Sequence, residues 1–281
     1  MSRLVGILRS GGSNVDSLER YDLAEEFLKG FTRSKIRTQV ILCLLEGEMS
    51  ASELEKRLGV RVTTILHAIK DMSKFDLVEK STHNNYSLTN LGKMQGLRLM
   101  DAIDFALVIE EHKKFWLTHD ITGIPPRLLQ DIGMLAKSEM IESDPTSILR
   151  TTEHFVSGLK ISKTIKGVSP YVIPAYPETI LEIAEKGANI NLILTSNVIK
   201  ALIRDYAGAL EKVNDYDNVV IRRLDKETTI GFTVTDSFLS LGLFRLDGNY
   251  DLGSDLICIG DSAVLWGNEL FEYYNELSKP L

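Results

Sequence analysis

Apolar residues recur at helical spacing in the first 75 residues of the chain. An apolar side chain returns every three or four positions, which is typical of a helix with one buried face. Ser50 and Glu53 have the S-x-x-E spacing of a capping box, and Gly59 then stops that short helix. The pattern predicts helices over residues 16–30, 34–46, 50–59 and 61–74.

Two short alternating segments, residues 77–80 and 86–89, follow around a polar turn. Alternation of apolar and polar residues is typical of strands, so these segments predict a hairpin. Helix, short helix, tight turn, helix and hairpin, in this order, is the pattern of a winged helix-turn-helix. It is the most specific pattern in the sequence, and it predicts a DNA-binding domain over residues 15–90.

The rest of the chain reads as one long helix followed by a domain of alternating strands and helices. Few helix breakers occur in residues 90–118, whereas the Gly-Ile-Pro-Pro run at residues 123–126 cannot continue a helix. We expect residues 127–165 to be mostly helical. Strands are predicted at residues 164–169, 190–195, 219–223, 232–235, 238–244 and 256–259, and helices at 177–187, 198–213 and 262–277.

The predicted fold class is therefore a combination of α+β and α/β structure. The predicted organisation is a flexible arm (1–14), the winged helix-turn-helix (15–90), a long linker or dimerisation helix (91–122) and an α/β regulatory domain (123–281).

Composition and charge exclude several classes of protein. The 281 residues are 44% hydrophobic and 25% charged, which rules out disorder and fibrous repeats. The net charge of -7 rules out a uniformly basic protein, but residues 29–98 hold 12 basic against 7 acidic side chains. No apolar run approaches the roughly 18 residues that span a bilayer. We expect a cytoplasmic protein with no membrane partner, and reduced, buried cysteines.

Motifs for catalysis, cofactors and metals are missing from the sequence. It has no Walker loop and no G-x-G-x-x-G, G-x-S-x-G or H-E-x-x-H motif. His112 and His119 lie seven apart on a predicted helix, but a third metal ligand is not close to them. Asp251, Asp255 and Asp261 cluster around glycines, which is common in acidic turns. We therefore expect no catalytic residue, no cofactor, no metal site and no enzymatic activity.

The predicted helix at residues 61–74 has a polar face opposite its apolar stripe. Arg61 can bond guanine with two hydrogen bonds, threonine methyl groups can touch thymine, and lysines suit phosphates. The predicted residues that contact double-stranded DNA are Arg61, Thr63, Thr64, His67, Lys70, Lys74 and Lys80, with His83, Asn84 and Asn85 at the wing tip. Two alternatives remain open: a merely solvated helix face, or a winged helix that binds protein.

The chain also resembles a known family. The residues that carry the resemblance are the winged-helix segment 34–91 and the stretches Ile-Glu-Ser-Asp-Pro (141–145), Lys-Gly-Val-Ser-Pro (166–170), Tyr-Pro-Glu (176–178) and Glu-Lys-Gly-Ala-Asn-Ile (185–190). Over residues 20–280 the chain resembles the methanogenesis- and filament-type transcriptional regulators of methanogenic archaea. This resemblance implies a cytoplasmic, dimeric transcription factor with a C-terminal effector domain.

The C-terminal region is also distantly similar to phospholipase-D-type folds. The H-x-K-x4-D motif that such catalysis needs is absent, so the similarity implies the fold without the chemistry. A small-molecule effector would bind at the carboxyl ends of the strands, where polar side chains and helix starts converge. The predicted ligand-binding residues are Ser169, Tyr171, Tyr176, Thr195, Ser196, Asn197, Asp236 and Ser237. Each of them can instead be a helix cap or a turn residue.

These observations predict a DNA-binding transcriptional regulator that forms a homodimer and responds to a small molecule or to its assembly state. The long helix is either the dimer contact or a helix packed on its own C-terminal domain. A protein-interaction scaffold and a catalytically altered phosphodiesterase-like enzyme are the alternative functions.

Overall fold

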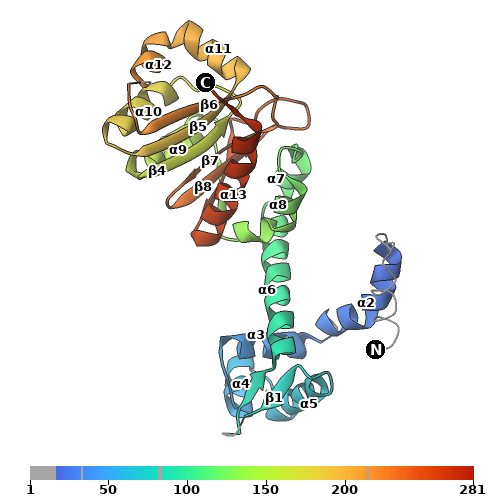
Figure 1. Ribbon diagram of the computed structural model, residues 1–281. Coiled ribbons are helices and arrows are strands. Elements are labelled where there is room, and N and C mark those ends of the chain that lie inside the picture. Colours follow the sequence, from blue (N-terminus) through green and yellow to red (C-terminus); the bar gives the residue numbers. More distant parts are fainter. Residues whose placement is uncertain (1–16, 33, 82–83, 214) are drawn as a thin grey trace. The chain divides into compact units, whose positions relative to one another are not determined.

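The computed structural model describes residues 17–32, 34–81, 84–213 and 215–281. The chain divides into two compact units, Met1–Ala102 and Ile103–Leu281, and each is described by itself (Figure 1). The predicted arm at residues 1–14 and the candidate wing residue His83 lie outside the described residues. None of the described helices is long and apolar enough to cross a membrane.

The first unit has the predicted winged helix-turn-helix order. It contains α2 (Ser17–Thr32), α3 (Lys35–Glu46), α4 (Ala51–Leu58), α5 (Val62–Ser73), β1 (Val78–Lys80), β2 (Tyr86–Leu88) and the first half of α6 (Asn90–Glu111). Ser50 and Glu53 form the predicted capping box of α4, and Gly59 ends that helix with a left-handed φ of 66°. The two strands pair antiparallel, with Val78 opposite Leu88.

The core of the first unit forms where α5 packs on α3 and α4. Leu54, Ile65 and Met72 are buried completely or nearly so. The first half of α6 approaches α3 closely through a glycine: a Cβ atom on Gly96 would lie 2.8 Å from the Leu45 side chain. The polar and charged residues of α5 are therefore left on the side away from this core.

The prediction of one continuous helix over residues 90–118 is wrong in one respect. The helix breaks at His112, between α6, which ends at Glu111, and α7 (Lys113–Thr118). The His112 side chain is buried, and its Nε2 lies 2.8 Å from the Ser138 hydroxyl. This contact joins residues 26 positions apart, so helical periodicity alone did not indicate the break.

The second unit is built on one mixed sheet of eight strands. Its strands are β3 (Ser138–Glu142), β4 (Thr164–Ser169), β5 (Asn189–Thr195), β6 (Val219–Leu224), β7 (Ile230–Thr235), β8 (Phe238–Leu243), β9 (Ser254–Ile259) and β10 (Lys279–Pro280), in the order β10-β6-β5-β4-β7-β8-β9-β3. The central strands β4, β5 and β6 are parallel, whereas every other pair is antiparallel.

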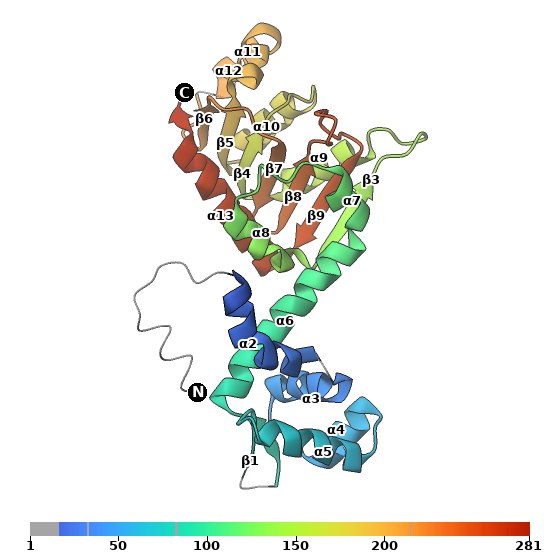
Figure 2. The ribbon, with the colours of Figure 1, turned by 90° about the vertical axis from the view of Figure 1, so that its right-hand side faces the viewer.

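Helices cover both faces of this sheet and make three layers (Figure 2). One face is covered by α8 (Pro126–Gln130), the 3-10 helix η1 (Ile132–Leu135) and α13 (Asp261–Leu277), and the other by α9 (Arg150–Ile161), α10 (Tyr176–Glu185), α11 (Ser196–Asp205) and α12 (Ala207–Val213). Trp266 of α13 is fully buried, and its indole N–H donates to the Leu128 carbonyl at 2.9 Å. The second unit is thus a mixed α/β domain.

Two sequence-based expectations for this unit are wrong. Residues 127–165 are not mostly helical, because Ser138–Glu142 forms the edge strand β3 and pairs antiparallel with β9. The predicted helix at residues 198–213 is divided at Tyr206, which has a non-helical φ of -138°. A strand of five residues gains its stability from its partner strand, and that partner lies more than 100 residues further along the chain.

Candidate functional site

Helix α5 presents one polar face to solvent. Its apolar residues Ile65, Ile69 and Met72 are buried, whereas Thr63 and His67 are exposed. The other exposed members of this face are Arg61, Thr64, Lys70 and Lys74. Arg61 is the residue before the helix and makes no capping hydrogen bond with its side chain. Its guanidinium is therefore available at the helix start.

The cations of this face differ in how far neighbouring acids neutralise them. Lys74 Nζ lies 2.9 Å from Asp71 Oδ1, and Arg37 contacts the other Asp71 oxygen at 2.6 Å. These two cations, Lys74 first, hold the pKa of the Asp71 carboxyl below its usual value. Within the described part of the chain, no acidic side chain forms an ion pair with Arg61 or Lys70. Both carry an uncompensated positive charge.

The hairpin places the described wing candidates near one another. Lys80 is exposed at the end of β1, and Asn84 is exposed with a left-handed φ of 64°. Asn85 accepts a backbone hydrogen bond from Ser81, which closes the turn. Asparagine tolerates a positive φ better than most residues, which explains its place at this tip.

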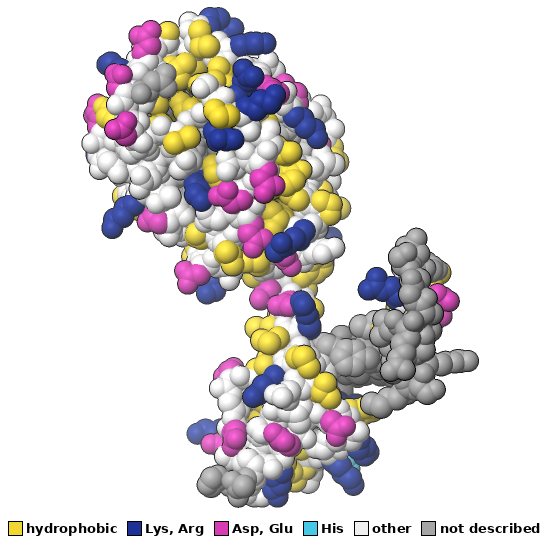
Figure 3. Space-filling view, viewed as in Figure 1, with side chains coloured by type: hydrophobic (Ala, Val, Ile, Leu, Met, Phe, Trp, Pro, Cys, Tyr) yellow, Lys and Arg dark blue, Asp and Glu magenta, His cyan; other side chains and the backbone are white. Residues whose placement is uncertain are grey.

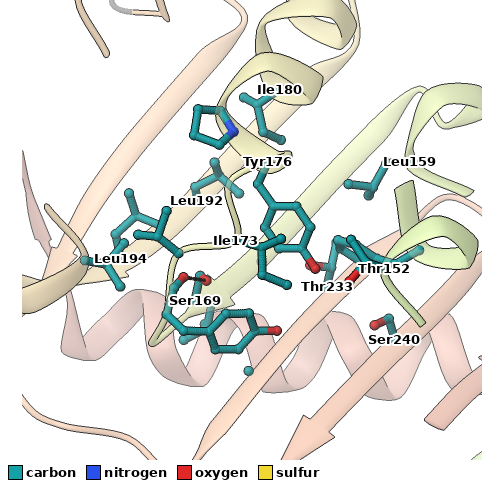
Figure 4. Close-up of a pocket in the computed structure, with 18 of the residues that line it drawn as sticks. Thr152, Leu159, Ser169, Ile173, Tyr176, Ile180, Leu192, Leu194, Thr233 and Ser240 are labelled. Carbon is teal, nitrogen blue, oxygen red and sulfur yellow. Dashed lines mark hydrogen bonds between the residues drawn. The ribbon is translucent and has the colours of Figure 1, made fainter. Parts of the chain in front are cut away.

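A cavity of about 140 Å³ lies in the second unit, between the sheet and helices α9 to α12. Its apolar lining includes five side chains labelled in Figure 4: Leu159, Ile173, Ile180, Leu192 and Leu194. Tyr176 extends from the start of α10 with its hydroxyl in the cavity (Figure 4). The polar end is lined by Ser169, Tyr171, Thr233, Ser240, Tyr250 and Asp255.

The cavity exists because small residues face it from neighbouring strands. Gly167 of β4 pairs with Thr233 of β7, which in turn pairs with Ser240 of β8. Next to this row, Gly231 pairs with Gly242. A Cβ atom on Gly231 would lie 2.9 Å from the Tyr171 ring, and one on Gly242 would overlap the Tyr250 hydroxyl. These glycines therefore make room for the side chains of Tyr171 and Tyr250.

Hydrogen bonds connect the polar groups at this end of the cavity. The Tyr171 hydroxyl donates to the Tyr250 hydroxyl at 2.7 Å, and Tyr176 bonds to Tyr171. Ser240 Oγ lies 2.9 and 2.8 Å from the two carboxylate oxygens of Asp255. Burial raises the pKa of Asp255 to about 6, although Ser240 works in the opposite direction. The cavity thus contains a carboxyl group whose charged form is disfavoured by burial, with no cation among the described residues to offset that cost.

Three of the eight predicted ligand-binding residues, Ser169, Tyr171 and Tyr176, line this cavity. The other five do not, and each of them has a hydrogen-bonding partner elsewhere. Thr195 caps α11 by accepting the Val198 N–H, and Asp236 accepts the backbone N–H of Lys163 at 2.8 Å. The remaining contacts are Ser196 to Asp225, Asn197 to Glu227 and Ser237 to Thr235.

Sequence reasoning missed the residues that reach the cavity from the antiparallel strands. Thr233, Ser240 and Asp255 lie within strands, not after them, and Tyr250 lies on the loop before β9. The rule that ligands sit at the carboxyl ends of parallel strands does not apply to β7, β8 and β9. The available signal was the small residues Gly231 and Gly242 inside otherwise apolar strands, which mark a close approach of another group.

A second cavity of about 530 Å³ shares Asp251 and Ser254 with the first. Asp251 is buried, accepts from Arg245 Nη2 at 2.9 Å and contacts His119 Nε2 at 3.1 Å. Burial favours the neutral acid, but the bonds from Arg245, the Gly253 N–H and His119 lower the pKa of Asp251 below its usual value. His112 and His119 both line this cavity. Across the described residues, no three His, Cys, Asp or Glu side chains are grouped so that they could hold a metal ion.

Comparisons with known proteins identify the relatives of this chain. Residues 25–107 match the family model of the methanogenesis regulatory protein FilR1, N-terminal domain, and residues 148–277 match that of its middle domain. The methanogenesis regulatory protein FilR1 of Methanothrix harundinacea (strain 6Ac) is 37% identical over 258 residues. That alignment covers 90% of this chain and 58% of the relative, so the chain spans less than two thirds of the relative's length.

Two solved structures show only distant likeness. One is TrmBL2, described as an archaeal chromatin protein with a novel mode of DNA binding; it is 15% identical at a TM-score of 0.42, covering 92% of this chain and 100% of its own. The other is the IclR transcriptional regulator of Alicyclobacillus acidocaldarius. It is 13% identical at a TM-score of 0.24, and the match covers 84% of this chain and 93% of the regulator. The resemblance to regulators of methanogenic archaea does not depend on these two and is confirmed by the sequence matches. The chain belongs to the family of the methanogenesis regulatory protein FilR1, and it contains segments that match the N-terminal and middle domains of that family.

Proposed function

We propose that this protein is a DNA-binding transcriptional regulator, in which α5 enters the major groove of duplex DNA. The observation that carries the proposal is the exposed face of α5, with hydrogen-bonding side chains and two cations that lack an acidic partner among the described residues. A helix of this size fits the groove, which is about 12 Å wide. The name of the 37% identical relative, a methanogenesis regulatory protein, supports the same function.

The residues of this face would have different roles. Arg61 lies at the start of α5, where recognition helices usually meet base edges, and its guanidinium can bond guanine. Lys70 and Lys80 would contact phosphates, which position the protein without reading sequence. The Asp71 carboxylate already neutralises Lys74, so Lys74 would contribute less than Lys70.

We further propose that the protein forms a homodimer through α6. In the first unit, α6 exposes a run of large apolar side chains over its outer surface (Figure 3). Leu91, Met94 and Leu97 are 52%, 58% and 60% exposed. A second copy of the same helix would bury these side chains, and two recognition helices would then match two half-sites on DNA.

The second unit would bind the effector in the cavity between its sheet and helices α9 to α12. An apolar cavity with a few convergent polar groups is the usual form of a small-molecule site. The sequence has no recognised catalytic motif, so such a site supports a sensor in preference to an enzyme. The distant likeness to phospholipase-D folds stays a prediction, and without the H-x-K-x4-D motif it does not favour hydrolysis.

The test is fluorescence anisotropy of a labelled duplex from the gene's own upstream region, across a salt series, beside an unrelated duplex. Tighter binding to the upstream duplex that weakens steeply with salt is the expected result. A winged helix that serves as a protein-interaction module would bind neither duplex, even at low salt. Weak binding of equal strength to both duplexes would contradict a sequence-reading function at this promoter.

A further inference from the structure

The cavity of the second unit contains a carboxylate without a compensating cation. Asp255 lines the cavity, and its two oxygens accept only from Ser240 and the Leu241 backbone N–H among the described residues. The cation on the adjacent loop, Arg245, pairs with Asp251 instead. A buried charge without a partner is unfavourable, so a positively charged ligand would gain from occupying this position.

Three aromatic rings line the same end of the cavity as Asp255. The rings of Tyr171 and Tyr250 lie with their centroids 3.9 Å apart, and the ring of Tyr176 approaches from α10. Burial raises the pKa of all three hydroxyls, so none of them becomes an anion at neutral pH. Aromatic rings attract cations, and their combination with one carboxylate is suited to an ammonium group.

The rest of the cavity lining is mainly apolar. Leu159 of α9, Ile180 of α10 and Leu192 of β5 contribute apolar side chains to it, with Thr152 beside Leu159 (Figure 4). A volume of about 140 Å³ is close to that of cavities that hold one benzene ring. The ligand therefore needs a compact apolar body next to its charge.

We infer that the cavity binds a small organic amine, with its ammonium group at Asp255 and a compact apolar group between α9, α10 and β5. The inference rests on the proposed effector role of the second unit and specifies the chemistry of the effector. No covalent step is involved, and the amine would bind as a reversible ligand.

Isothermal titration calorimetry with three probes of similar size tests the inference on the full chain. The probes are benzylamine, benzyl alcohol and benzoate at pH 7.5, which carry a positive charge, no charge and a negative charge on the same ring. We expect benzylamine to bind about tenfold or more tightly than benzyl alcohol, and benzoate not to bind. Equal affinities of the amine and the alcohol, or tighter binding of benzoate, would overturn the inference without requiring any variant.

A pair of matched variants assigns the binding to the cavity. Asp255→Asn removes the charge but keeps the shape, so the preference for the amine over the alcohol should disappear. Asp217→Asn makes the same change at an exposed position outside the cavity and should leave the preference intact. An unchanged preference in Asp255→Asn would overturn the assignment.

Binding of the amine is measured on the protein alone, whereas the proposed regulatory function is measured on DNA. A failure of benzylamine to bind would therefore overturn the amine inference and leave the DNA-binding proposal intact. Conversely, a failure of the protein to bind the upstream duplex would not affect the amine site, because the calorimetric affinities test that site independently.

Discussion

His119 and Asp251 are joined by a buried contact of 3.1 Å although 132 residues separate them in the chain. Both ring nitrogens of His119 face acceptors, since Nδ1 lies 2.9 Å from the Phe115 carbonyl and Nε2 faces the carboxylate. His119 ends α7, the helix that follows α6, while Asp251 follows the cavity residue Tyr250. The pair thus joins the end of α7 to the loop before β9 within the second unit.

Loss of this contact should destabilise the second unit. Asp251→Asn removes the charge from a buried group that His119, Arg245 and the Gly253 N–H all contact. We expect a loss of about 2 kcal/mol in the free energy of unfolding, measured by urea denaturation at pH 7. Because the folded-state pKa of Asp251 is lowered, its stabilising effect is present at neutral pH and is lost as the pH falls below about 4. A similar loss in the exposed control Asp217→Asn would contradict this role.

Asp255 should make stability depend on pH in the opposite direction. Burial raises its folded-state pKa to about 6, so ionisation opposes folding, and stability is lost as the pH rises from about 4 to 7. The titratable groups that face Asp255 are Tyr171, Tyr176, Tyr250 and Cys258, and their pKa values are raised, so they stay neutral in this range. We expect roughly 2 kcal/mol of this loss to vanish in Asp255→Asn, measured as the difference from wild type in urea unfolding at several pH values. If the free energy of unfolding of the wild type and of Asp255→Asn changed with pH in the same way, this role of Asp255 would be contradicted.

Three substitutions on α5 should separate base reading from phosphate contact. Arg61→Ala should reduce the free energy of binding to the preferred duplex by about 1–3 kcal/mol and that to an unrelated duplex only slightly, because it removes a base contact. Lys70→Ala should weaken binding to both duplexes and reduce the slope of log affinity against log salt by about 1. Lys74→Ala is the matched control, since Asp71 already neutralises that lysine. Anisotropy across a salt series measures all three, and equal effects of Lys70→Ala and Lys74→Ala would refute the distinction.

The close approach of α6 to α3 should make one glycine intolerant of a side chain. Gly96→Ala places a Cβ atom 2.8 Å from the Leu45 side chain, so we expect the free energy of unfolding to fall by about 1–3 kcal/mol. Gly208 lies in α12 with open space around it, and Gly208→Ala should instead stabilise by about 0.5–1 kcal/mol. Thermal unfolding of the two variants would show shifts of opposite sign, and a stabilised Gly96→Ala protein would disprove the tight packing.

The proposed dimer should depend on the exposed apolar surface of α6. Leu97→Glu introduces a charge there and should shift the protein toward the monomer in sedimentation equilibrium, with weaker binding to a two-site duplex. Leu246 is 70% exposed on a loop of the second unit, so Leu246→Glu is the control. A wild-type protein that remains monomeric at all concentrations, or an unchanged Leu97→Glu dimer, would contradict the proposal.

The sequence by itself determined the first unit almost completely. The capping box of Ser50 and Glu53, the stop at Gly59 and the apolar stripe of α5 are local signals, because helix periodicity and capping depend on residues a few positions apart. The polar face of α5 follows from the same periodicity, so its candidate residues could be named before the fold was known. The family resemblance was also carried by short contiguous stretches.

Only the tertiary structure decided where the cavity lies and what lines it. Strand β3 depends on a partner strand more than 100 residues further along the chain, and His112, where the helix breaks, contacts a serine 26 positions away. The contact between Ser240 and Asp255 crosses from β8 to β9. Antiparallel pairing brings Gly231 beside Gly242, and this leaves room for Tyr171 and Tyr250. Local periodicity shows which residues share a face of one element, but it cannot show which faces meet. The physical reason is that a binding cavity is formed by the packing of several distant segments, whereas a recognition helix is formed by one.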